Sequence, residues 1–301
     1  MSRERLVSHA TDLAWSLWTE LGVPGVVRRH TGVAIDPEPL IVASPRLAAH
    51  DPRLLGLVYS WCADNDQRIS ASRLRGLAAL APSSAQEALA PMVATLRQDQ
   101  GVRWSVPSPG EPWAAPPEKR LTQVNVSRPP LLRLRLRALA GVGARADVLA
   151  ELLGRADHWV RASDLQDEGY SKRNVARILS ELTEAGLVEM RVQGKTHLIR
   201  LPRTTAIGEL VGATDLAFPR WRPILAVVLT VIDLADLSDR PAATRRVEAH
   251  KAAERLRPAA REIELASPPS TRGNPDAWDE VLTWAADQTS ALATGDSLAL
   301  A

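Results

Sequence analysis

The chain has 301 residues, of which 45% are apolar and 24% charged, and its formal net charge at pH 7 is +2. This composition excludes collagen, a long coiled coil and bulk disorder, and the length suggests about two or three domains of ordinary size. The single cysteine, Cys62, excludes an internal disulfide and fits a reducing compartment. Since neither an export signal nor an apolar run of membrane-spanning length is found, we expect a cytoplasmic protein with no membrane partner.

Residues 1–100 predict an all-helical N-terminal domain, because apolar residues recur at helical spacing after residues that can cap a helix. The expected helix starts are Thr11, Asp36, Asp51, Ser70 or Ser72, and Ser84. Residues 101–130 form a proline-rich segment, which excludes a helix or a central strand there. We expect either a linker or a strap across a neighbouring surface, and Trp104 and Trp113 favour the strap.

The middle of the chain carries the excess of positive charge. Residues 128–203 contain 14 basic and 9 acidic side chains, a balance of +5, whereas residues 1–127 have a balance of +1 and residues 204–301 one of −4. This local excess of positive charge favours a polyanionic partner for the middle segment. The high arginine content of the whole chain is weaker evidence for such a partner.

Within the expected domain 131–203, residues 145–201 have the most specific pattern of the chain: a helix, a short strand, a second helix, a turn, a third helix and a hairpin. Ser163 is expected to cap the second helix, and Ser171 the third, which runs from Lys172 to Ala185. Its apolar residues share one face and are Val175, Ile178, Leu179 and Leu182. Residues 187–192 should pair with residues 196–201 across a turn at Gly194.

These residues resemble the winged helix-turn-helix domains of bacterial transcriptional regulators such as the MarR and ArsR families. The resemblance lies in residues 161–165, 170–175 and 182–188 and in the two hairpin strands. It implies that the third helix lies in the major groove of double-stranded DNA and that the hairpin, or wing, touches a flanking minor groove or phosphates. More loosely, a winged helix joined to helical domains is similar to repressors and antitoxins encoded beside nucleotidyltransferase toxins.

Burying the apolar face of the third helix turns its polar residues outward, where they can meet DNA. Arg173 and Asn174 are the candidates for base readout, and Lys172 and Arg177 for phosphate contacts. The helix N-terminus at Ser171 adds backbone donors for a phosphate. Further phosphate contacts are expected from the hairpin residues Arg191, Lys195 and Arg200.

Residues 204–301 predict a helical C-terminal bundle. A nearly all-apolar helix over Ile224–Leu237 must be buried, either in the core or in a dimer contact. A charged helix is expected over Ala242–Leu256, and Asn274–Pro275 should cap a last helix.

No glycine-rich phosphate loop, metalloprotease motif or hydrolase motif occurs, so neither catalysis nor a cofactor or metal is expected. The aspartates 233, 236 and 239 are more typical of a solvated helix face than of a metal site. Arg245 and His250 have the spacing of helical ribonucleases that resemble the HEPN superfamily, although chance produces such pairs in an arginine-rich chain. Three tryptophans, Trp221, Trp278 and Trp284, could enclose a ligand but are more typical of core.

The sequence therefore predicts a mainly α protein with a helical N-terminal domain, a central winged helix-turn-helix with a two-stranded wing, and a helical C-terminal domain. The expected function is sequence-specific binding of double-stranded DNA by a homodimer that represses transcription. The alternative is a protein-interaction module, such as an antitoxin or adaptor whose helical domains hold a partner enzyme.

Overall fold

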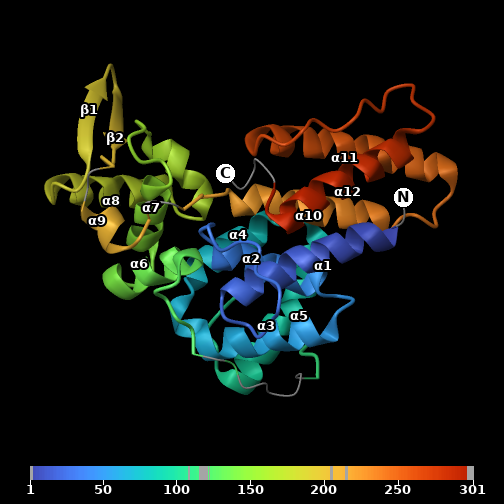
Figure 1. Ribbon diagram of the computed structural model, residues 1–301, viewed down its shortest axis with the longest axis horizontal. Helices are drawn as coiled ribbons and strands as arrows, with labels where there is room; N and C mark the ends of the chain where they lie inside the picture. Colours follow the sequence, from blue (N-terminus) through green and yellow to red (C-terminus); the bar gives the residue numbers. More distant parts are fainter. Residues whose placement is uncertain are drawn as a thin grey trace.

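The computed structural model describes residues 3–107, 109–114, 121, 123–203, 206–213 and 216–296, and within them the protein is mainly helical with one small antiparallel sheet (Figure 1). The first five α-helices are α1 (Arg3–Glu20), α2 (Pro37–Leu47), α3 (Pro52–Asn65), α4 (Ala71–Leu80) and α5 (Ser83–Gln100). The middle elements are α6 (Leu132–Ala140), α7 (Ala144–Leu153), the 3-10 helix η3 (Ala162–Glu168), α8 (Lys172–Glu184), β1 (Glu189–Gln193), β2 (Thr196–Arg200) and α9 (Ala206–Leu210). The last helices are α10 (Trp221–Ala235), α11 (Ala242–Glu262) and α12 (Ala277–Thr294). None of the helices in these described ranges is long and apolar enough to cross a membrane.

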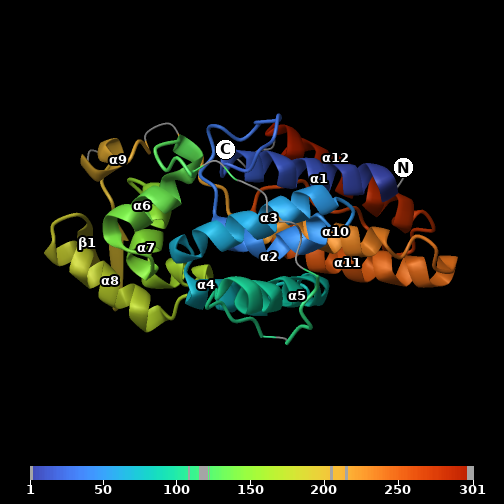
Figure 2. The same ribbon diagram turned by 90° about the horizontal axis from the view of Figure 1, so that it is seen from below.

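Helices from the two ends of the chain share one hydrophobic core. Figures 1 and 2 show α1 lying along α12, and α10 lying against α2. At the centre of this core the indole rings of Trp18 and Trp61 meet edge to face, with centroids 5.2 Å apart. We call α1–α5 together with α10–α12 the body. The N-terminal and C-terminal helices, which the sequence analysis treats as separate domains, are thus packed into one unit.

A second core belongs to α6–α9 and the β1–β2 hairpin, which we call the module. In both views the module lies at one end of the molecule and α11 at the other (Figures 1 and 2). Val211 is buried in the module core and Ile207 packs against it, so the module extends beyond residue 203. The hairpin forms as expected from the sequence, with Met190 opposite Ile199 and Val192 opposite His197.

Helix α10 is surrounded by the other helices of the body. Its apolar residues, from Trp221 to Ala235, lie in the body core, and Trp221 Nε1 donates a hydrogen bond to the carbonyl oxygen of Ala34 (2.7 Å). Of the two roles expected for this helix, the structure assigns it to the core. A dimer contact would therefore have to use another surface.

The proline-rich segment lies across α5 as a strap. Trp104 is buried in the body core, and the backbone N–H of Trp113 donates to Thr95 Oγ1 (3.0 Å). Gly110 approaches the backbone of α5 so closely that an added Cβ would lie 2.4 Å from the carbonyl carbon of Ala90. Glycine is therefore the only residue that fits between strap and helix at this point. Pro116 and Pro117 lie outside the described residues.

Several helix starts differ from the expectation. Thr11 lies inside α1, which begins at Arg3, and its hydroxyl donates to the carbonyl oxygen of Leu47 (3.4 Å). Ser163 is not a cap either, because η3 starts after Arg161, whose backbone N–H donates to Asp164 Oδ2 (2.8 Å). Asp51 and Ser171 do cap α3 and α8. Short polar residues cap a helix only where the chain enters from an extended conformation, which sequence alone does not specify.

Candidate nucleic-acid interface

The outward face of α8 is set by its N-cap and its apolar stripe. Ser171 Oγ accepts the backbone N–H of Asn174 (3.3 Å), which fixes where the helix begins. The four apolar residues of the stripe are buried in the module core, as the sequence predicts. The opposite face therefore consists of polar and small side chains that lie at the surface of the module.

The predicted DNA-binding residues of α8 differ in whether their side chains are already held by ion pairs or hydrogen bonds. Lys172 and Arg173 are exposed, and no described residue forms an ion pair or a side-chain hydrogen bond with either. Arg177 is also exposed, but it forms an ion pair with Glu181 and donates to Asn174 Oδ1 (3.0 Å). The side chain of Asn174 is thus half-buried and turned toward Arg177. Of the four residues, Lys172 and Arg173 have the most freedom to reach a ligand.

Three residues of this surface escaped the sequence analysis. Ala176 and Ser180 are exposed beside Arg173 and Arg177, and their small side chains leave room for a ligand to approach the helix backbone. Arg145, at the start of α7, places Nη2 2.7 Å from Glu181 Oε2. The helical period of α8 could have identified Ala176 and Ser180, whereas the contact of Arg145 joins residues far apart in the sequence.

Glu181 lies between two arginines and offsets part of their charge. The hydrogen bond from Arg145, followed by the attraction of Arg177, holds the pKa of this carboxyl below its usual range. Glu181 is therefore ionised at neutral pH and bridges α7 to α8. Another anion can readily take the place of the Glu181 carboxylate beside these arginines, because surface ion pairs contribute little free energy.

The hairpin places its cations in two different settings. Lys195 lies in the exposed turn between β1 and β2. Arg191 and Arg200 instead stack on Trp159, with their guanidinium carbons 4.3 and 4.9 Å from the ring centroid, and Arg200 also pairs with Glu189. A stacked guanidinium keeps its N–H donors in its own plane, so both arginines retain donors at the edge of the stack.

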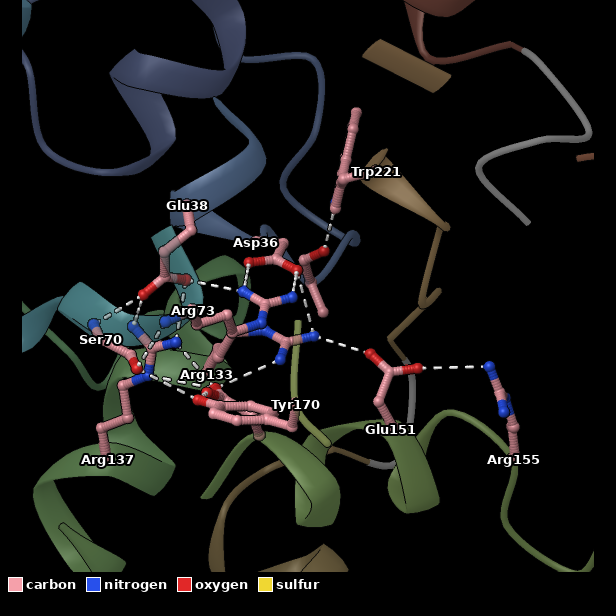
Figure 3. Close-up of polar contacts among 12 residues, drawn as sticks. Asp36, Glu38, Ser70, Arg73, Arg133, Arg137, Glu151, Arg155, Tyr170 and Trp221 are labelled. Carbon is pink, nitrogen blue, oxygen red and sulfur yellow. Dashed lines mark hydrogen bonds and ion pairs between the residues drawn. The ribbon is translucent and has the colours of Figure 1, made fainter. Parts of the chain in front are cut away.

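Behind α8, a buried cluster of charges joins the module to the body (Figure 3). We call it the ionic joint. It consists of the carboxylates of Asp36, Glu38, Asp147 and Glu151 and the guanidinium groups of Arg73, Arg133, Arg137 and Arg155. Among the described residues, four negative charges thus meet four positive charges, and the members come from the body and the module alike.

The contacts within the ionic joint are short and mostly bidentate. Arg73, whose side chain is fully buried, donates to both oxygens of Asp36 (2.6 Å each) and to Glu38 (2.8 Å). Arg137 places its two terminal nitrogens 2.6 and 2.9 Å from the oxygens of Glu38. Asp147 accepts from both Arg133 (3.2 Å) and Arg137 (2.8 Å). A buried charge is tolerated only with such compensation.

The ionisation of the joint follows from these contacts. Burial alone would raise the pKa of Asp36 and of Asp147, but attraction by the neighbouring arginines outweighs it and holds both pKa values below the ordinary one. Burial, together with the charge of Asp147, raises the pKa of Tyr170, so this phenol remains a donor. Within residues 128–203 the joint contains Arg133, Arg137 and Arg155 against Asp147 and Glu151, so four of the five excess positive charges are carried by side chains outside the joint.

The other candidate sites take part in structural contacts. Asp233 and Asp236 form ion pairs with Arg46, and no group of acidic, histidine or cysteine side chains in the described ranges could hold a metal ion. The guanidinium of Arg245 lies over the ring of Trp278, and His250 Nδ1 is 2.7 Å from Thr271 Oγ1. Trp221 and Trp278 are buried in the body core, and Trp284 packs against it.

No protein-family model matches the sequence, and no curated protein or solved structure shows significant similarity to it.

Proposed function

We propose that the protein is a transcriptional regulator, most simply a repressor, that binds double-stranded DNA through the exposed face of α8 and the β1–β2 hairpin of a winged helix-turn-helix module. The observation that carries this proposal is the N-capped helix α8, which presents Lys172 and Arg173 without ion-pair partners among the described residues at one end of the molecule. A helix with an exposed basic face can enter the major groove, and its N-terminal residues then reach base edges.

The surroundings of α8 support this role. Small side chains at Ala176 and Ser180 let the helix approach the bases, while Arg173 and Asn174 donate to base edges. Lys172 and Arg177 on the helix, and Lys195 with Arg191 and Arg200 on the hairpin, supply phosphate contacts, to which we add Arg145. Glu181 releases its arginines when a phosphate replaces it. A homodimer would place two α8 helices in successive major grooves.

The proposal is tested by fluorescence anisotropy with the DNA upstream of the protein's own coding sequence and with a scrambled duplex. A specific regulator binds the upstream DNA at least about a thousandfold more tightly than the scrambled one. With the six phosphate-contacting cations named above, raising the salt from about 50 to about 200 mM lowers the affinity at least about a thousandfold.

The double variant Arg173→Ala/Arg177→Ala should lower the affinity for the upstream DNA at least about thirtyfold, because two lost contacts of about 1 kcal/mol or more each sum to at least about 2 kcal/mol. The matched control is Arg246→Ala/Arg255→Ala, which removes the same charge from exposed positions on α11, at the far end of the molecule (Figure 1). Unchanged binding by the α8 variant would exclude this helix as the DNA-binding element. Equal, weak binding of both duplexes by the unmodified protein would favour the protein-interaction alternative.

A further inference from the structure

The turn that leads into α8 is held against the body. Tyr170 directly precedes the N-cap Ser171, and its hydroxyl donates to Asp147 Oδ2 (2.5 Å) and lies 3.2 Å from Ser70 Oγ (Figure 3). Ser70 is the N-cap of α4 in the body, whereas Asp147 belongs to α7 and to the ionic joint. One side chain thus links the start of α8 to both units of the protein.

The backbone of the same turn also touches α4. Gly169 has a φ of +81°, and a Cβ added there would lie 3.1 Å from Arg73 Cγ. A Cβ added to Gly76 would lie 3.3 Å from the carbonyl oxygen of Gly169. Two glycines therefore allow the turn to lie directly on α4, beside the fully buried guanidinium of Arg73.

We infer that Tyr170 is a positioning residue of the DNA-binding surface: its hydroxyl holds the first turn of α8 in register with the body through the ionic joint. This inference rests on the proposed function. The ionic joint holds the turn in one orientation, because each of its buried charges must keep its partners to stay compensated. Without the hydroxyl, the first turn of α8 would have to be ordered again on binding, and the affinity for DNA would fall accordingly.

The test compares Tyr170→Phe with Tyr59→Phe, the same change at the other tyrosine of the chain, which is buried in the body core. Affinity for the upstream DNA is measured well below the thermal midpoint of each variant, so that a loss of global stability alone leaves it unchanged. We expect Tyr170→Phe to bind about tenfold more weakly, equivalent to about 1.4 kcal/mol, and Tyr59→Phe to bind as the unmodified protein does. Equal affinity of both variants and the unmodified protein would overturn the inference.

Hydrogen exchange supplies a second measurement that does not depend on DNA. In Tyr170→Phe the backbone amides of Asn174 and Val175, which donate to Ser171, should exchange faster than in the unmodified protein, while those of α10 keep their protection. If the unmodified protein binds no DNA, the proposed function fails, yet faster exchange confined to α8 would still identify Tyr170 as the residue that positions this helix. Unchanged exchange at Asn174 and Val175 would show that Tyr170 does not position α8.

Discussion

His30 is a buried base in the body with a partner on each ring nitrogen. Nδ1 lies 2.8 Å from Ser16 Oγ on α1, Nε2 lies 3.0 Å from the carbonyl oxygen of Leu292 on α12, and the ring meets Trp221 edge to face. The neutral ring satisfies both partners if Nε2–H donates to the carbonyl and Nδ1 accepts the hydroxyl proton. Burial lowers the pKa of His30. The hydrogen bond to Leu292 raises this pKa in part, and the positive charge of Arg29 lowers it further.

This environment predicts a loss of stability in mild acid. The unfolded chain binds a proton near the ordinary histidine pKa of about 6.5, whereas the folded protein binds it only at lower pH. The free energy of unfolding should therefore fall as the pH drops below about 6.5, down to the pKa of the folded state. Urea titrations from pH 7 to pH 5 measure this slope. The slope of the free energy of unfolding against pH should be smaller in His30→Gln and unchanged in His158→Gln, which alters an exposed histidine. Equal slopes in the unmodified protein and both variants would show that His30 does not cause the loss of stability.

The strap depends on Gly110. Because an added Cβ would meet the backbone of α5 at Ala90 rather than a flexible side chain, Gly110→Ala must displace the strap. We expect the free energy of unfolding to fall by about 1–3 kcal/mol, as for other substitutions that overfill a packed site. Gly32→Ala is the matched control, since an added Cβ there meets nothing within 4 Å. Urea titration measures the free energy of unfolding of both variants. Similar values would mean that the strap does not need this close approach to α5.

Elements that depend on local signals could be predicted from the sequence. Helix α8 combines a capping serine with an apolar stripe, and its outward face follows from the helical period alone. Helix α11 passes the expected end at Leu256 and continues to Glu262, with the exposed Pro258 inside it. Proline usually ends a helix, but here packing against α10 and α12 maintains the helical backbone. The shared core of α1 and α12 likewise has no local signal.

The charge partners of the candidate site could not be predicted for the same reason. Arg137 lies 99 residues from Glu38, and Arg145 lies 36 residues from Glu181, so only the folded chain brings them together. Trp159 stacks with two of the predicted phosphate-binding arginines, a contact for which the sequence likewise has no local signal. The sequence thus predicts which cations face outward on α8, but not which of them are already engaged.

At the scale of the whole molecule, the ionic joint is one contact through which the body and the module meet, and its charges balance among the described residues. Arg73 is central to it, because its guanidinium bridges Asp36 and Glu38 at the start of α2 while its Cγ lies beside the turn that precedes α8. Removing one member of such a cluster leaves the others buried without compensation, which costs more than the intact cluster contributes.

Arg73→Met should therefore lower the free energy of unfolding by about 3–5 kcal/mol, measured by urea titration. Adding Asp36→Asn restores the charge balance, because Arg137 still compensates Glu38, and the double variant should recover much of the loss. Arg3→Ala is the control for an exposed pair: its partner Asp236 also binds Arg46, and the change should leave the free energy of unfolding almost unchanged. If Arg73→Met were no less stable than Arg3→Ala, or if Asp36→Asn made it worse, balanced charge would not be what joins the body to the module.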